Sequence, residues 1–188
     1  MSVRFWGNFL FAFQEEYLIA DVEQLTHIKR HSLAYYDRIG IFRPSISASA
    51  QKNSRRKYSV LDILVLQAVS ELKRKGMAFT KIRKVIEYLR ENHGLEQPFH
   101  AALDGRHNVR ILTDGEKAFY ICFNDHEVIE HLKKGGQYLL LDVSDAAFDL
   151  KEKIMALHLF KRKKESEKFK QLNFPTLSKL NNHSTVSR

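Results

Sequence analysis

Cysteine is nearly absent from this 188-residue sequence, which contains one, Cys122. A single thiol excludes an internal disulfide and any metal site built from several thiolates, and it favours a reducing compartment such as the cytoplasm. Long apolar runs are also missing, since none reaches the roughly 20 residues that a membrane-spanning helix needs. We therefore expect a cytoplasmic protein that makes no contact with a membrane.

Acidic residues are scarce relative to basic ones. The sequence has 31 Lys and Arg against 22 Asp and Glu, for a net charge of +9, and such a surplus favours polyanionic partners, nucleic acid first. The surplus is uneven: residues 1–92 carry 16 basic and 9 acidic side chains, residues 93–160 carry 7 and 11, and residues 161–188 carry 8 and 2. An acidic middle between basic ends predicts parts with separate roles.

Turn-forming residues predict a boundary in the middle of the chain. His93-Gly94 ends a helical pattern, Pro98 interrupts the residues that follow, and Asp104-Gly105 is a turn signal. We expect five divisions: an N-terminal extension (1–16), a first domain (17–92), a linker (93–106), a small second module (107–164) and a basic, disordered tail (165–188). The opening MSVRFWGNFLFAFQ lacks a signal-peptide cleavage site, so we expect a short packing helix there or a start codon placed too far upstream.

Helical spacing of apolar residues runs through the first domain. It predicts a short helix over residues 17–25 and a second, strongly basic helix over residues 28–39. Two short helices joined by a tight turn are the helix-turn-helix arrangement, whose second helix can enter the major groove of DNA. After Pro44, polar residues and the basic run RRK predict a wing. Ser59 and Asp62 have the spacing of a capping box that starts a third helix, and a fourth is expected from Thr80 to about Glu91.

Three segments in order, LAYYDRIGIFRP, RRKYSVLDILVLQ and LKRKGMAFTKIRKVI, resemble the MerR family of bacterial transcription regulators over residues 17–90. The resemblance implies a winged helix-turn-helix that binds a near-palindromic promoter site in double-stranded DNA as a homodimer, with RNA polymerase as a further contact. Two positions depart from the family pattern: His27 stands where Gly is common, and Ala34 stands where an Arg often precedes the Tyr pair. We expect altered sequence preference or weaker affinity, with the fold intact. Metal-sensing members rely on cysteine ligands, so no metal or other cofactor is expected.

The candidate DNA contacts lie in the second helix and the wing. Positions near the start of a recognition helix read base edges, whereas positive charges and hydroxyl groups around it anchor to phosphate. We assign base reading to Lys29, Arg30 and His31. The resemblance assigns phosphate contact to Tyr35, Arg43, Arg55, Arg56 and Tyr58, and Arg38 lies on the same exposed side of the helix, whereas Tyr36 is predicted to lie in the core. The alternative for the basic start of the helix is a plain solvated face.

The second module is predicted to be small and mixed. Apolar segments at 108–113 and 117–123 flank Asp114-Gly115, a strong hairpin signal, and a helix over 125–134, a strand over 138–143 and a helix from 145 to about 164 follow. The fold class is therefore α+β, with a winged helix-turn-helix (four helices plus a β wing) followed by a β-β-α-β-α module. Because such a module has little core of its own, we expect a homodimer. The strand over 138–143 and one apolar side of the last helix would form the dimer interface. The residues on that side of the helix are Ala146, Leu150, Ile154, Leu157 and Phe160.

Two function classes remain open at this point. The first is a MerR-type regulator, cytoplasmic and associated with the nucleoid. The alternative is a protein-binding adaptor or antitoxin-like partner whose DNA binding is autoregulatory, which a co-purifying protein would favour. The basic run 161–164 is either a solvated helix end or a nonspecific DNA arm. An enzyme is not expected, because no nucleophile with an adjacent base, phosphate-binding Gly loop or pair of catalytic carboxylates stands out.

Overall fold

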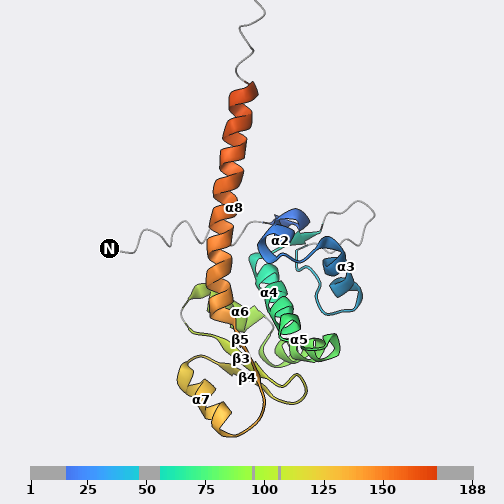
Figure 1. Cartoon of the computed structure of the whole chain (residues 1–188), viewed down its shortest axis with the longest axis vertical. Helices are drawn as coiled ribbons and strands as arrows, with labels where there is room; N and C mark the ends of the chain where they lie inside the picture. The colour runs from blue at the N-terminus through green and yellow to red at the C-terminus, as the bar shows by residue number, and fades with distance from the viewer. Residues whose placement is uncertain (1–15, 47–55, 95, 106, 173–188) are drawn as a thin grey trace, which may run out of the picture. The chain divides into compact units, whose positions relative to one another are not determined.

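The computed structural model describes residues 16–46, 56–94, 96–105 and 107–172. It divides into two compact units, one ending at Lys151 and one beginning at Glu152. The second unit is formed by the greater part of the long helix α8 (Val143–Leu172), drawn in orange and red in Figure 1. Helix α8 continues through residues 165–172, which the sequence predicts to be disordered, because these residues have no helix breaker. Among the described helices, none has the length and hydropathy of a membrane span.

The predicted helix-turn-helix pair is confirmed as α2 (Ile19–Thr26) and α3 (Arg30–Arg38). Each helix buries apolar residues at helical spacing, with Val22 and Leu25 from α2 and Leu33 from α3 all at most 2% exposed. Helix α2 ends at His27, which has φ 58° and ψ 13° and whose backbone N–H donates to the carbonyl oxygen of Glu23. A non-Gly residue therefore occupies the left-handed conformation that the turn between the two helices requires.

A two-stranded antiparallel sheet stands beside the helix pair. It consists of β1 (Tyr17–Leu18) and β2 (Lys57–Tyr58), and Tyr17 is paired with Tyr58. The two tyrosines are each 1% exposed, so the sheet is anchored in the core. The predicted wing leads into β2, and most of it lies outside the described residues.

The third and fourth predicted helices are confirmed as α4 (Val60–Arg74) and α5 (Phe79–His93). The capping box at the start of α4 is present: the Ser59 hydroxyl accepts from the backbone N–H of Asp62 at 3.0 Å, and the Asp62 carboxylate accepts from the backbone N–H of Ser59 at 2.9 Å. The same carboxylate, in a residue only 6% exposed, also accepts from the backbone N–H and hydroxyl of Ser45 at 3.0 and 2.8 Å. Asp62 thus fixes both the start of α4 and the segment that follows Pro44.

The segment predicted to be a linker contains a helix instead, α6 (Glu96–Asp104). Phe99, Ala102 and Leu103 are each at most 3% exposed, and α6 packs against α4 and α5. Pro98, read as a breaker, is the third residue of α6, where its missing N–H would have no partner within the helix. The segment is therefore part of the core of the first unit.

The β-β-α-β-α order of the second module is confirmed. Its strands β3 (Arg110–Thr113), β4 (Phe119–Cys122) and β5 (Leu139–Asp142) form an antiparallel sheet in the order β4-β3-β5, with helix α7 (Asp125–Lys133) between β4 and β5. At the tip of the predicted hairpin, the Asp114 carboxylate accepts from the backbone N–H groups of Glu116, Lys117 and Ala118 at 2.8 to 2.9 Å. These bonds close the turn that joins β3 to β4.

The hairpin of the module packs against the helix-turn-helix part. The Phe119 ring stacks on Tyr88 of α5 with centroids 4.5 Å apart, and the Lys81 ammonium group lies 3.0 Å from the Glu116 carboxylate. Gly115, with φ 74°, allows the close approach, because a Cβ atom there would lie 3.0 Å from the Cβ of Lys81. The acidic module and the basic helices thus form one unit up to Lys151, and part of their charge difference is used in ion pairs between them.

Candidate nucleic-acid interface

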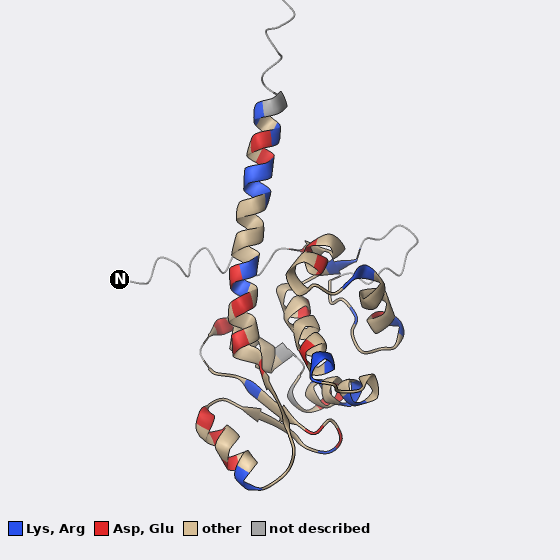
Figure 2. Cartoon of the chain, viewed as in Figure 1, with Lys and Arg blue, Asp and Glu red and all other residues tan. Residues whose placement is uncertain are grey.

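The start of helix α3 is exposed and basic. Lys29 is the N-cap residue, and the side chains of Lys29, Arg30 and His31 all lie at the surface; that of Arg30 is 64% exposed. Figure 2 shows the basic residues that flank the short α3 helix. The three residues assigned to base reading are therefore accessible, and their role stays a prediction.

Glu23 of α2 holds the start of α3 in place. Lys29 provides no side-chain cap, and the Glu23 carboxylate instead accepts from the backbone N–H of Arg30 at 2.7 Å. The same carboxylate lies 3.5 Å from the Arg30 guanidinium. A carboxylate at a helix N-terminus satisfies a free N–H group and interacts favourably with the helix dipole. One acidic residue of the first helix therefore positions the backbone of the second.

The opposite side of α3 is packed into the core, as predicted for Tyr36. This residue is 7% exposed, its ring lies 5.6 Å from that of Phe79 in an edge-on arrangement, and burial raises its pKa. Tyr35 is 37% exposed and touches the edge of the same ring at 5.7 Å. The Arg38 guanidinium lies 5.4 Å from the centre of the Tyr35 ring. Tyr35 and Arg38 thus present an exposed aromatic ring and a positive charge on the same helix as Arg30 and His31.

Asp37 joins α3 to the arginines on either side of the wing. Its carboxylate lies 3.2 Å from the Arg56 guanidinium and 3.7 Å from that of Arg43. The side chains of Asp37 and Arg56 are each 21% exposed, whereas that of Arg43 is 77% exposed. Arg43 is consequently the freer of the two to reach a phosphate, and Arg56 contributes mainly to holding the end of the wing against α3. Arg55 lies outside the described residues.

The prediction that Tyr58 contacts phosphate is corrected by its position. Its ring is 1% exposed and stacks on Phe42 with centroids 6.4 Å apart and an angle of 6° between the planes. Burial raises the pKa of Tyr58, an effect that Arg56 partly offsets. The two residues of β2 point to opposite faces, with Lys57 half-exposed and Tyr58 inward. Alternation along the strand separates the two residues, and the pairing of Tyr58 with the buried Tyr17 accompanies its inward position.

Two basic residues outside the predicted set also pack near α3. One lies over the Phe79 ring, which contacts Tyr35 and Tyr36, and the other lies at the end of α3. The Lys73 ammonium group lies 4.5 Å above the Phe79 ring, and the Arg83 guanidinium donates to the backbone carbonyl of Ile39 at 2.5 Å. Lys73 comes from the last turn of α4 and Arg83 from α5. Neither position is close to α3 in the sequence, so only the packing of the helices reveals them.

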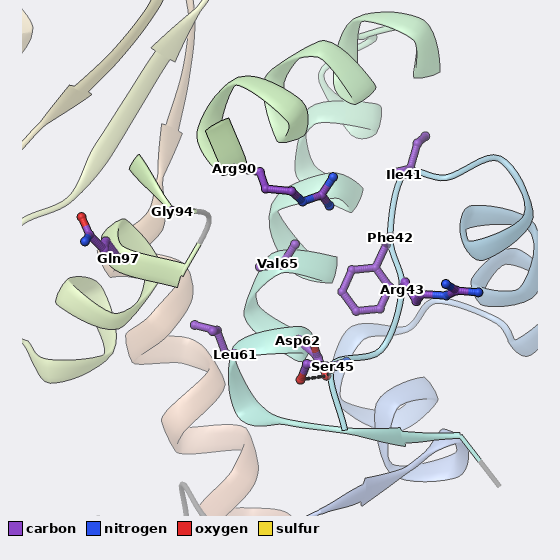
Figure 3. Close-up of a pocket in the computed structure, with 10 residues that line it drawn as sticks. All are labelled: Ile41, Phe42, Arg43, Ser45, Leu61, Asp62, Val65, Arg90, Gly94 and Gln97. Atoms are coloured by element: carbon purple, nitrogen blue, oxygen red, sulfur yellow. Dashed lines mark hydrogen bonds between the residues drawn. The ribbon is translucent and has the colours of Figure 1, made fainter. Parts of the chain in front are cut away.

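A cavity of about 490 Å³ lies behind the segment that connects α3 to the wing. Figure 3 shows Leu61 and Val65 of α4 and the Phe42 ring around it, with Arg90 reaching across from α5. The Asp62 carboxylate at its edge is occupied by the hydrogen bonds to Ser45. The cavity is therefore lined by both apolar and polar side chains, and two arginines, Arg43 and Arg90, are among them.

Comparison with known proteins identifies the family of this part of the chain. Residues 17–89 match the family model described as MerR HTH family regulatory protein. Residues 17–89 are a MerR-type DNA-binding domain. The resemblance seen in the sequence is thereby confirmed for this domain, and α2 and α3 are its helix-turn-helix.

Relatives of the MerR-type domain extend the similarity beyond residue 89. An uncharacterized HTH-type transcriptional regulator of Mycobacterium bovis and two of Mycobacterium tuberculosis are each 30% identical to this chain over 135 residues. The similarity covers 72% of this chain and 56% of each relative. This chain therefore spans little more than half the length of the mycobacterial relatives.

Proposed function

We propose that the chain is a MerR-type transcription regulator that binds a near-palindromic promoter site as a homodimer. The observation that carries the proposal is the exposed basic start of α3, where Lys29, Arg30 and His31 all face solvent. Their side chains can reach base edges when α3 enters a major groove, since the N-terminal residues of a recognition helix make these contacts. A promoter site would also bring the protein within reach of RNA polymerase.

The residues around α3 divide into two roles in this proposal. The start of the helix reads bases, with Arg or Lys suited to guanine and His31 able to donate or accept. Arg43, Tyr35 and Arg38 contact phosphate, because their side chains are exposed on the flanks of the helix. Arg56 acts on the DNA indirectly, through its ion pair with Asp37, by keeping the wing in position.

Two-fold symmetry supplies the remaining geometry. A homodimer presents two copies of α3, and each occupies a half-site about 34 Å from the other, one helical turn of DNA, or a multiple of that distance. The operator is then near-palindromic because the protein is symmetric. The module after residue 107 acts on the DNA-binding domain through α5, which it contacts at Tyr88 and Lys81.

Selection of binding sites from randomised duplexes tests the function, and two variants test the roles. We expect the full chain to enrich one near-palindromic motif. Arg43→Ala should weaken binding to all sequences and lower the slope of log affinity against log salt by about 1. His31→Ala should change the enriched bases and leave the salt slope unchanged.

Lys134→Ala, which removes a positive charge from an exposed residue at the end of α7, serves as the control for net charge. It should leave both the motif and the salt slope unchanged. Failure to enrich any motif at low salt would refute the proposed function. Equal losses from Arg43→Ala and His31→Ala, with no difference in salt dependence, would refute the division of roles.

A further inference from the structure

The cavity behind the segment that connects α3 to the wing has room for a small organic molecule. Its volume of about 490 Å³ falls within the range of about 300–1,000 Å³ that is typical of ligand pockets. Leu61 and Val65 of α4 lie on one side of it, and the Phe42 ring of the connecting segment lies on another. These residues all belong to the first unit, so one part of the chain forms the whole cavity.

Arg90 brings an unpaired positive charge to this cavity. It lies near the end of α5, is exposed, and reaches across toward the connecting segment in Figure 3. The other arginines described up to residue 105 each have an ion pair, a hydrogen bond or a ring contact: Arg30, Arg38, Arg43, Arg56, Arg74 and Arg83. Within the described residues, Arg90 has none of these contacts. Its guanidinium is therefore free to bind a group from outside the chain.

The charges around the cavity favour an anion over a cation. Arg43 and Arg90 both line it. Asp62 lines it too, but this residue is only 6% exposed and its carboxylate already accepts three hydrogen bonds from Ser45 and Ser59. A cationic ligand would meet two arginines, whereas a carboxylate finds an exposed guanidinium. The planar guanidinium group binds carboxylates through two parallel hydrogen bonds.

We propose that this cavity binds a small organic anion with an apolar body, whose carboxylate pairs with Arg90 while its body lies against Leu61, Val65 and Phe42. An apolar wall with a few convergent polar groups is the combination typical of small-molecule sites. An inorganic ion would use the arginine and leave the apolar wall uncovered. The site lies within the MerR-type domain, beside the helix-turn-helix.

The position of the cavity couples it to DNA binding. Its wall includes the segment that joins α3 to the wing, and this segment contains Arg43, the proposed phosphate contact. A bound anion lowers the positive potential that attracts phosphate to Arg43. The anion should therefore weaken DNA binding, a step that rests on the proposed function. By linkage, DNA weakens binding of the anion by the same factor.

Calorimetric titration of the full chain without DNA tests the site, with 4-phenylbutyrate as the probe and octanoate as a second apolar anion. The neutral 4-phenylbutanamide has the same body without the charge and should bind about tenfold more weakly than the acid. Inorganic phosphate has the charge without the body and should also bind about tenfold more weakly. If the amide or phosphate binds as well as the acid, the proposed ligand class is wrong. If neither carboxylate binds at millimolar concentration, the site is refuted.

Two variants test whether the probe occupies this cavity. Arg90→Gln should weaken binding of 4-phenylbutyrate by about tenfold and leave binding of the amide unchanged. Leu61→Trp fills the space from a half-buried position and should weaken both. Arg74→Gln is the matched control, because Arg74 is exposed and lies about 14 Å along α4 from Val65. Equal effects of Arg90→Gln and Arg74→Gln would show nonspecific attraction and refute the site.

Affinity for a selected duplex tests the coupling, with sodium chloride at matched concentration as the reference for ionic strength. Saturating 4-phenylbutyrate should weaken duplex binding about fivefold in the original protein and have no effect on Arg90→Gln. Without the probe, the two proteins should bind the duplex equally. If the probe binds and duplex affinity does not change, the regulatory step is refuted. If Arg90→Gln weakens duplex binding and leaves probe binding unchanged, Arg90 is a DNA contact and the site is refuted.

The outcomes separate this inference from the proposed function. A chain that binds the probe through Arg90 and selects no DNA motif would refute the proposed function and leave the anion site standing. A chain that selects a motif and binds no probe would do the reverse. Circular dichroism of each variant confirms that the helices are retained, and Arg90→Gln carries the test if Leu61→Trp does not fold.

Discussion

Replacing His27 by glycine should stabilise the protein. His27 lies in the left-handed region, with φ 58°, and is exposed, so its side chain contributes little packing. A non-Gly residue there costs about 1–2 kcal/mol, whereas glycine avoids that cost but gives up about 0.5–1 kcal/mol of chain entropy on folding. The difference predicts a gain of about 0.5–1 kcal/mol in the free energy of unfolding. For a chain of this size about 1 kcal/mol shifts the melting temperature by about 2–4 °C, so the expected rise is about 1–4 °C.

The assay is urea unfolding followed by circular dichroism, which should show a higher midpoint at an unchanged slope. Gln24→Gly is the matched control, because Gln24 is exposed in the interior of α2, where glycine costs about 1 kcal/mol. The two substitutions therefore predict opposite signs three residues apart. A His27→Gly variant that is no more stable than the original protein would refute the argument that this turn is strained.

Three further substitutions test other parts of the account. Glu23→Ala should lower stability by about 1 kcal/mol in urea unfolding and reduce affinity for the selected site, because the backbone N–H of Arg30 loses its acceptor. Asp62→Ala should cost about 2 kcal/mol, since one buried carboxylate accepts from both Ser59 and Ser45; a change below about 0.5 kcal/mol would contradict this. Burial raises the pKa of Asp114, but the backbone hydrogen bonds outweigh it, and the pKa lies below its ordinary value of 3.8. Asp114 therefore stabilises the fold above about pH 4 and loses that effect as the pH falls through its folded pKa. Asp114→Asn should make the free energy of unfolding less dependent on pH in acid. If the pH dependence is unchanged in the variant, Asp114 does not have this role.

Local signals in the sequence predict much of the fold. The capping box at Ser59 and the hairpin at Asp114-Gly115 are both present where the sequence places them. Each feature depends on residues within four positions of one another, so it can be predicted from the sequence without knowing what packs against it. The exposed start of α3 is predictable for the same reason, since its buried side is marked by Leu33 and Tyr36 at helical spacing.

Long-range packing accounts for what the sequence does not reveal. Pro98 has the appearance of a helix breaker until its place in the first turn of α6 is known, and the burial of Phe99 depends on α4 and α5. The charge difference between the two halves suggests separate domains, but the Lys81–Glu116 pair uses that difference to join them. Tyr58 is placed in the core by its pairing with Tyr17, a residue 41 positions earlier.

Dimethyl sulfate footprinting on a selected duplex, which reports on guanine N7 in the major groove, tests whether the exposed start of α3 reads that groove. The full chain should protect two patches about one helical turn apart, centred on a near-palindrome. The double variant K29A/R30A, with a circular dichroism spectrum like that of the original protein, should lose this protection. Protection that is unchanged in K29A/R30A would contradict major-groove reading by the start of α3.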